Sequence, residues 1–227
     1  QQPWGIMHLP EGGFDAALQG IAGDWLNPGL PIIASGMVGS AQGWREAPYV
    51  ELPAGADTLA QSLTAFDVGD GLKLHIVPGV RHARPDVMRG EEIQIFGALN
   101  NLQIADAEFV LPGTHSKWVT VQSGRIAHFS TFMTGELYAV MRQHSILGRT
   151  LPPLSSDEAL DEAHFDQGVR LSLQGGSVLH HLFGVRTLAL LERGLLLAEM
   201  GFNPIILERG KIVRERTVDT FKFWRKA

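Results

Sequence analysis

Residues Phe109 to Glu136 read FVLPGTHSKWVTVQSGRIAHFSTFMTGE, and this stretch decides the fold. The polar turn Gly113–Lys117 and the pair Ser123-Gly124 separate three apolar runs, a pattern that predicts three successive strands. Thr134-Gly135-Glu136 then predicts a helix start, because Thr134 can serve as an N-cap with an acidic residue in the first turn. We therefore expect a β-meander that runs directly into a helix.

The first turn of this meander has the composition of a phosphate site. It places a glycine, two hydroxyls, a histidine and a lysine between apolar runs: Gly113, Thr114, His115, Ser116 and Lys117. Such a turn can offer backbone N–H groups, hydroxyls and a cation to a phosphate. The alternatives are a solvated turn lysine for Lys117 and a hydrogen-bonded turn histidine for His115.

Composition restricts the function classes. The chain has 227 residues, a formal net charge of -5 and no cysteine, so disulfides, thiolate chemistry and Cys-based zinc sites are excluded. No basic stripe suggests nucleic acid, and no apolar run approaches the roughly 20 residues needed to span a bilayer. The N-terminus, QQPWGIMHLP, lacks the features of a signal peptide. We expect a cytoplasmic protein, and the missing start Met indicates a longer gene product.

Two polar clusters precede the meander. The first follows the apolar run Leu30–Ser35, which predicts a buried parallel strand. Three glycines come next in Gly36–Trp44, together with Ser40 and Gln42. Ligands bind at the carboxyl ends of such strands in α/β proteins, although a tight loop that needs positive φ explains the glycines equally well.

The second cluster is Arg84–Glu92, RPDVMRGEE, after a predicted strand at Leu72–Val77 that Pro78–Arg81 closes. Asp86 is placed to cap the helix that continues through Ile93–Leu99. An Asp at such a strand-to-helix junction can also act as a general base. Elsewhere, apolar spacing predicts helices at Phe14–Leu26 and Thr58–Phe66 and a final hairpin around Arg209-Gly210.

Four segments together resemble one family. They are SGMVGSAQGWREAPYVELPA from Ser35, IVPGVR with PDVMRGEE from Ile76, LPGTHSKWV from Leu111, and FMTGELYAVMRQHSILGR from Phe132. In this order and at this spacing they resemble the 2-dehydro-3-deoxygalactonokinases. These are sugar-acid kinases of the actin/hexokinase-like ATPase superfamily.

The resemblance implies an α/β fold of two actin-like, ribonuclease H-like domains, each with a mixed sheet flanked by helices, and a cleft between them. We expect a substrate-side domain at residues 1–105 and an ATP-side domain at residues 106–227. The superfamily's first phosphate hairpin, of Asp-x-Gly-Thr type, should lie ahead of the given sequence. The turn at residues 113–117 would be its second phosphate loop.

The activity implied is transfer of the ATP γ-phosphate to the 6-hydroxyl of 2-dehydro-3-deoxygalactonate, with Mg²⁺ held mainly by ATP oxygens. The expected base is Asp86, with Glu91 as second candidate. The expected phosphate binders are Gly113, Thr114, His115, Ser116, Lys117 and Thr134. The expected sugar-acid binders are Ser35, Gly36, Met37, Ser40, Gln42, Trp44, Arg89 and Glu92. An arginine, Arg81, Arg84 or Arg89, would pair with the substrate carboxylate.

Two alternatives stay open at this point. One is a non-catalytic protein that binds a sugar acid without ATP, which the absence of the first phosphate hairpin favours. The other is a kinase of a different 2-keto-3-deoxy sugar acid. A protein-ligand metal site, nucleic acid and a membrane are not expected. A homodimer is compatible with the aromatic residues Trp4, Trp44 and Phe221–Trp224.

Overall fold

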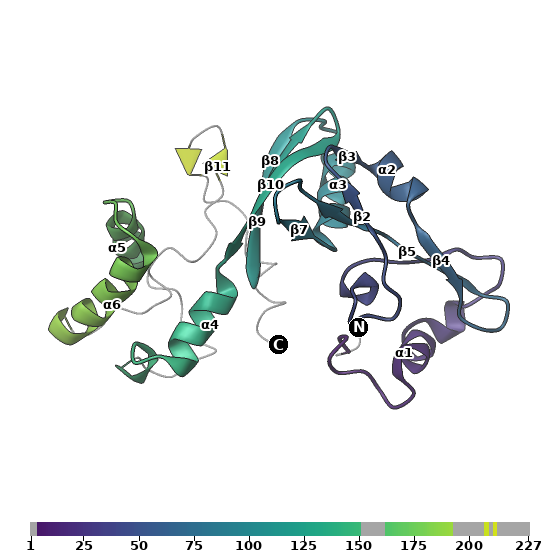
Figure 1. The fold of residues 1–227 in the computed structure, drawn as a ribbon, viewed down its shortest axis with the longest axis horizontal. Coiled ribbons are helices and arrows are strands. Elements are labelled where there is room, and N and C mark those ends of the chain that lie inside the picture. Colours follow the sequence, from purple (N-terminus) through teal and green to yellow (C-terminus); the bar gives the residue numbers. More distant parts are fainter. Residues whose placement is uncertain (1–3, 151–161, 193–206, 209–210, 213–227) are drawn as a thin grey trace. The chain divides into compact units, whose positions relative to one another are not determined.

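The computed structural model of the protein describes residues 4–150, 162–192, 207–208 and 211–212 (Figure 1). They form helices with short mixed and antiparallel sheets, so the predicted α/β class is confirmed. The chain divides into two compact units. Unit 1 comprises Gln1–Phe109 and Val119–Ser130, and unit 2 comprises Val110–Trp118 and Thr131–Ala227.

The first sheet of unit 1 has the order β1-β5-β4, with β1 Ile32–Ala34, β5 Lys73–Ile76 and β4 Thr64–Asp67. Strand β1 is parallel to β5, as predicted, but it lies at the sheet edge and the Ile33 side chain is 63% exposed. The expectation of a fully buried strand is therefore wrong. The predicted helix at 58–66 is also wrong in its second half, because α2 (Ala56–Gln61) ends before β4. Thr64 and Phe66 pair with β5 instead, as β-branched and aromatic residues favour.

The core of unit 1 lies against this sheet. Ala47, Leu74 and Ile76 are buried at its centre. Strand β1 is preceded by helix α1 (Gly13–Ala22) and the 3₁₀ turn η1 (Gly23–Trp25). It is followed by the 3₁₀ turn η2 (Met37–Gly39). Trp44 stacks on Phe14 with ring centroids 5.6 Å apart and meets Phe66 edge-on at 5.4 Å. The loop after β1 is thus anchored by its own tryptophan.

A second sheet in unit 1 has the order β2-β6-β7, with β2 Tyr49–Glu51, β6 Gly79–Arg81 and β7 Val87–Met88. Residues 79–81, expected only to close the strand at 72–77, form a strand of their own because they pair in parallel with β2. Helix α3 (Glu91–Leu102) follows β7 after two residues. This connection carries the polar cluster found in the sequence.

The predicted meander is confirmed as β8 Ala107–Leu111, β9 His115–Gln122 and β10 Arg125–Met133, which with β3 Ala54–Gly55 form a sheet of order β3-β10-β9-β8 (Figure 1). Ser123 and Gly124 join β9 to β10 with φ of 50° and 73°. Positive φ at both central residues is the geometry of a type I′ hairpin turn, whose twist matches that of the strands.

Unit 2 continues into helices: α4 Gly135–His144, η3 Gly148–Thr150, α5 Glu162–Ser172 and α6 Val178–Glu192. Leu147, Leu182 and Val185 form its buried cluster, against which Tyr138 and Met141 pack. Strands β11 Leu207–Glu208 and β12 Lys211–Ile212 pair antiparallel, which confirms the final hairpin; its turn lies outside the described residues. Within the described ranges, no helix is both long and apolar enough to cross a bilayer.

Candidate functional site

The polar turn of unit 2 is joined to the N-terminus of α4. The turn proper is shorter than predicted, since His115, Ser116 and Lys117 already belong to β9. The Gly135 N–H donates to the Gly113 carbonyl at 3.2 Å, and the Glu136 N–H donates to the Thr114 carbonyl at 3.1 Å. Two of the N–H groups that a helix N-terminus leaves unpaired are therefore satisfied by the turn itself.

Close approach of these backbones requires a glycine at 135. A Cβ there would lie 2.8 Å from the Gly113 carbonyl oxygen and 3.2 Å from the Thr114 Cα. We expect Gly135→Ala to lower the free energy of unfolding by about 1–3 kcal/mol, since overpacking forces backbone shifts of this cost. Urea denaturation measures it. Gly184→Ala in α6 is the matched control, because nothing lies within 4 Å of its added Cβ.

That control should gain roughly 0.5–1 kcal/mol from helix propensity alone. Equal stabilisation by both substitutions would contradict the packing assigned to Gly135.

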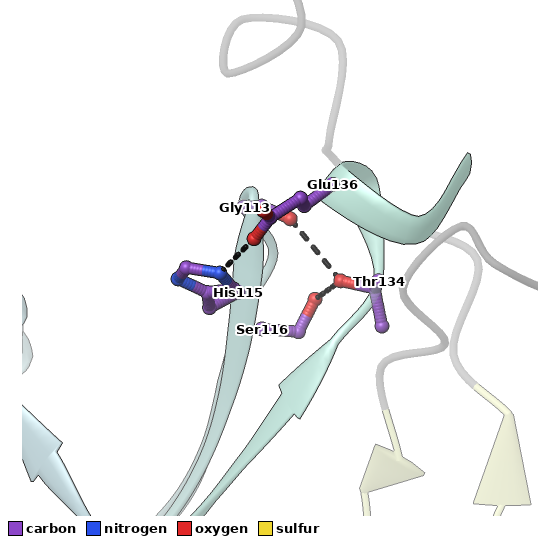
Figure 2. A network of polar contacts seen from close by, with 5 residues as sticks. All are labelled: Gly113, His115, Ser116, Thr134 and Glu136. Carbon is purple, nitrogen blue, oxygen red and sulfur yellow. Dashed lines mark hydrogen bonds and ion pairs between the residues drawn. The ribbon is translucent and has the colours of Figure 1, made fainter. Parts of the chain in front are cut away.

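A chain of hydroxyl hydrogen bonds reinforces the junction (Figure 2). The Thr134 hydroxyl donates to the Gly113 carbonyl at 3.1 Å and lies 2.5 Å from the Ser116 hydroxyl. A threonine hydroxyl has one proton, and Gly113 receives it, so Ser116 is the donor to Thr134. Thr134 precedes α4 at the N-cap position, as predicted, but its side chain bonds the turn and not the helix N–H groups.

The remaining side chains of the turn divide by exposure. Ser116 is 5% and Lys117 6% exposed, so the alternative of a solvated lysine is wrong. The Lys117 ammonium donates to the Thr131 hydroxyl on β10 at 2.8 Å. Thr114 and His115 are exposed, and the His115 Nε2 contacts a Glu136 carboxylate oxygen at 2.5 Å (Figure 2). The hydrogen-bonded histidine considered above is thus present, and its partner is Glu136.

In unit 1, the two upstream clusters meet at a pair of glycines. Gly36, after β1, has φ of 91°, and Gly90, before α3, has φ of 109°. A Cβ on Gly90 would lie 3.1 Å from the Gly36 Cα, so the two loops touch through their backbones. This contact brings the two loops together, and their use as one ligand site stays a prediction.

Arg89 extends from this contact between the loops. Its Nη2 donates to the Ala47 carbonyl at 2.7 Å, and its guanidinium lies 4.3 Å from the centroid of the Tyr49 ring. Its Nε and Nη1 are buried and have no hydrogen-bond partner among the described residues. Buried donors are nearly always paired, so these two N–H groups indicate a place for an acceptor oxygen.

Glu91 and Glu92 open α3 and fold back onto the preceding backbone. The Glu91 Oε2 accepts the Arg89 N–H at 3.1 Å, and both oxygens of Glu92 accept the Gly90 N–H, at 2.8 and 2.7 Å. Glu92 is 0% exposed, and its carboxylate is directed at its own loop. The expectation that Asp86 caps the helix is wrong, because α3 begins at Glu91 with Gly90 as the N-cap.

Burial gives Glu92 a measurable pH signature. Desolvation is the largest effect on this carboxyl and raises its pKa above the ordinary 4.5, with Glu91 adding to the rise and the Gly90 N–H and Arg89 opposing it. A carboxyl with a raised pKa in the folded state binds more protons than in the unfolded state, so it stabilises below pH 4.5 and loses that contribution as pH rises.

We therefore expect the free energy of unfolding of the wild type, relative to Glu92→Gln, to fall as pH increases from 4.5 through the folded-state pKa. Urea titrations at several pH values measure the difference. Glu108→Gln is the control, since the exposed Glu108 carboxylate bonds the Thr120 hydroxyl. If the difference in unfolding free energy between the wild type and Glu92→Gln did not change with pH, the desolvation of the Glu92 carboxylate would be contradicted.

Asp86 lies in the hairpin between β6 and β7. Its N–H donates to the Arg84 carbonyl, and its carbonyl accepts the His82 N–H at 2.9 Å. The Arg84 N–H donates to His82 Nδ1 at 3.0 Å, so His82 Nε2 carries the ring proton and donates to His128 Nδ1 at 3.1 Å. A histidine pair therefore fastens the Asp86 hairpin to β10.

The other residues predicted to bind the sugar acid differ in solvent exposure. Ser35, Met37 and Gln42 are exposed, whereas the Ser40 side chain is buried and its hydroxyl bonds the Met37 carbonyl. Of the three candidate arginines, Arg81 forms an ion pair with Glu51. Arg84 supplies its backbone to the hairpin, and of these three arginines it is Arg89 that has buried N–H donors without a partner among the described residues.

Sequence reasoning missed two partners. Tyr49, whose ring lies under the Arg89 guanidinium, has no sequence signal for that contact. Glu136 has only the sequence signal of an acidic residue in the first turn of a helix, and its contact with His115 depends on where α4 begins after β10. The two-residue turn at Ser123-Gly124 sets His115 opposite position 132, so the hairpin register alone does not predict the contact between His115 and Glu136.

Comparison with known proteins identifies the family of the chain. The model of the family described as 2-keto-3-deoxy-galactonokinase matches residues 1–197. This chain belongs to that family. The Escherichia coli (strain K12) protein "2-dehydro-3-deoxygalactonokinase" is 38% identical over 174 residues, which is 75% of this chain and 56% of that protein.

Two further relatives come from rhizobia. "Probable 2-dehydro-3-deoxygalactonokinase DgoK1" of Rhizobium meliloti (strain 1021) is 40% identical over 168 residues, 72% of this chain and 54% of its own. A crystal structure of a candidate 2-dehydro-3-deoxygalactonokinase from Sinorhizobium meliloti superposes with a TM-score of 0.75 at 36% identity, covering 85% of this chain and 66% of that one. The chain thus spans about half the length of the curated relatives it matches.

Proposed function

We propose that this member of the 2-keto-3-deoxy-galactonokinase family acts in an ATP-dependent kinase that phosphorylates the 6-hydroxyl of 2-dehydro-3-deoxy-D-galactonate in galactonate catabolism. The family match along residues 1–197 supports the reaction class. The observation that carries the acceptor class is the Arg89 guanidinium, with two buried N–H donors that lack a partner in the described residues. A carboxylate of a sugar acid supplies the acceptor oxygens that such donors need.

In this proposal, residues 1–105 bind the sugar acid. Gly36 and Gly90 bring the two loops together, Arg89 faces the acid group, and exposed Ser35, Met37 and Gln42 line the surface around it. Asp86 accepts the proton of the attacking hydroxyl. Glu91 is the weaker candidate, since one of its oxygens already accepts the Arg89 N–H. The buried Glu92 and Ser40 and the partly buried Trp44 hold these loops in shape.

Residues 106–227 bind the nucleotide as MgATP in this proposal. The exposed Thr114 and His115 meet the phosphates, while Gly113, Ser116 and Thr134 fix the turn on α4. Lys117 contributes its charge from a buried position beside Thr131. The described residues contain no cluster of three or more metal-ligating side chains. Mg²⁺ would therefore arrive on ATP, whose oxygens and water are its usual ligands at kinase sites.

The test is a coupled ADP-release assay on the full-length gene product with MgATP and a panel of 2-keto-3-deoxy sugar acids. We expect turnover with the galactonate derivative. If only a different acid supported turnover, the proposed kinase activity would stand and the proposed substrate would be wrong. Ligand-induced melting shifts with a sugar acid but none with MgATP, and no turnover, would favour the non-catalytic binding protein.

A further inference from the structure

Most hydrogen-bond donors near the polar turn of unit 2 are already used within the protein. The Gly135 and Glu136 N–H groups donate to the carbonyls of residues 113 and 114. The Thr134 proton goes to Gly113 and the Ser116 proton to Thr134. Each of these donors would have to break an internal bond before it could bind a phosphate. Within the described part of the chain, the turn side chains open to solvent are Thr114 and His115.

The orientation of the His115 ring is fixed by one contact. A carboxylate is only an acceptor, so the 2.5 Å contact with Glu136 requires a proton on His115 Nε2. Figure 2 shows the second ring nitrogen on the edge directed away from Glu136. The hydrogen bond at one ring nitrogen sets the tautomer and the direction of the other. Glu136 therefore determines where the Nδ1 of His115 points.

The charges of the pair suit a phosphate ligand. When Nδ1 is also protonated, the imidazolium presents an N–H donor and a positive charge on its free edge, and the Glu136 carboxylate balances that charge from behind. Hydrogen bonds between ionised groups are roughly twice as strong as neutral ones. The pair is about half exposed, with 47% and 44% of the two side chains accessible, so a ligand can reach it.

We propose that Glu136 is a positioning residue for nucleotide binding: it holds His115 so that Nδ1–H donates to a phosphate oxygen of MgATP. This inference rests on the proposed kinase function, and it adds a residue and a direction of action that the sequence did not indicate. Glu136 acts only through His115, and it makes no contact with the nucleotide itself.

The experiment is a double-mutant cycle on the full-length gene product, with the Kd for MgATP and kcat as readouts. We expect Glu136→Ala and His115→Ala each to weaken MgATP binding about tenfold or more, the range for loss of a hydrogen bond to a charged group. The KM for the sugar acid should stay within about twofold. Glu136→Gln should restore most of the affinity, because its amide oxygen still accepts the Nε2 proton.

The decisive arm is Glu136→Ala in the His115→Ala background. A residue that acts through His115 should change the Kd by less than about twofold there, since the two effects are then fully coupled. An undiminished effect in that background, or tighter MgATP binding by the single Glu136→Ala variant, would overturn the proposal. Glu108→Ala, an exposed carboxylate on β8, controls for a general change of charge.

A second readout separates this inference from the proposed function and does not need a folded Ala variant. Imidazole ¹⁵N NMR of the wild type and Glu136→Gln should show a proton on His115 Nε2, and adding MgATP should shift the Nδ1 resonance. No shift of the His115 resonances at saturating MgATP would overturn the positioning role. Absence of any MgATP binding by the wild type would instead reject the proposed function.

Discussion

Asp86→Asn is expected to reduce kcat about a hundred- to ten-thousandfold, the usual contribution of a general base in proton transfer. Asparagine keeps the shape of the side chain and cannot accept the hydroxyl proton. The backbone bonds of Asp86 to His82 and Arg84 hold the hairpin in both variants. The Kd for MgATP should therefore change by less than about twofold, because the substitution acts on the transferred proton. Steady-state kinetics and calorimetry on the full-length gene product measure the two quantities.

Glu91→Gln is the comparison that assigns the base. Its carboxylate already accepts the Arg89 N–H, and glutamine preserves an acceptor there, so we expect a much smaller loss of kcat. Asp15→Asn, an exposed residue in the first turn of α1, serves as the neutral control. A large loss for Glu91→Gln together with near-normal turnover for Asp86→Asn would exchange the two roles.

Phe129→Ala is expected to lower the free energy of unfolding by about 3–5 kcal/mol, the range for removing a fully buried phenyl ring. Phe129 is 1% exposed and is among the largest fully buried side chains of the described residues. Phe132 on the same strand is 51% exposed and provides a control of identical chemistry. Its replacement by Ala should cost clearly less, since about half of its surface stays in water on folding. Equal costs in urea denaturation would contradict the burial of β10.

Local patterns predicted the parts of the fold that local rules govern. The meander followed from two turn signals between β-branched and aromatic runs, and α3 and α4 followed from apolar spacing after polar starts. The errors arose where pairing with a distant strand decided the outcome. Residues 79–81 were expected only to close a strand after a proline, yet they form β6 because β2 lies beside them. The apolar spacing predicts a helix that runs into Thr64–Asp67, whereas in the structure these residues pair with β5.

The candidate site shows the same division. Residue types alone indicated the turn at 113–117 and the cluster at 84–92, since glycines, hydroxyls and charges between apolar runs have few structural uses. They gave no information on exposure, which separates Thr114 and His115 from the buried Ser116 and Lys117. Nor did they show that Glu92 binds its own loop, because that depends on the positive φ of Gly90 turning the chain back.

The direction of the hydroxyl chain at the polar turn has a consequence for sequence drift. Thr134 both donates, to Gly113, and accepts, from Ser116, whereas the Ser116 hydroxyl donates to Thr134 and accepts no bond from the described residues. Losing the hydroxyl at 134 removes two bonds at once and leaves the buried Ser116 donor unpaired, a costly state. Losing it at 116 removes one bond and leaves the Thr134 bond to Gly113 in place. Over generations, position 134 should accept only threonine or serine, while position 116 is freer to change and should change first.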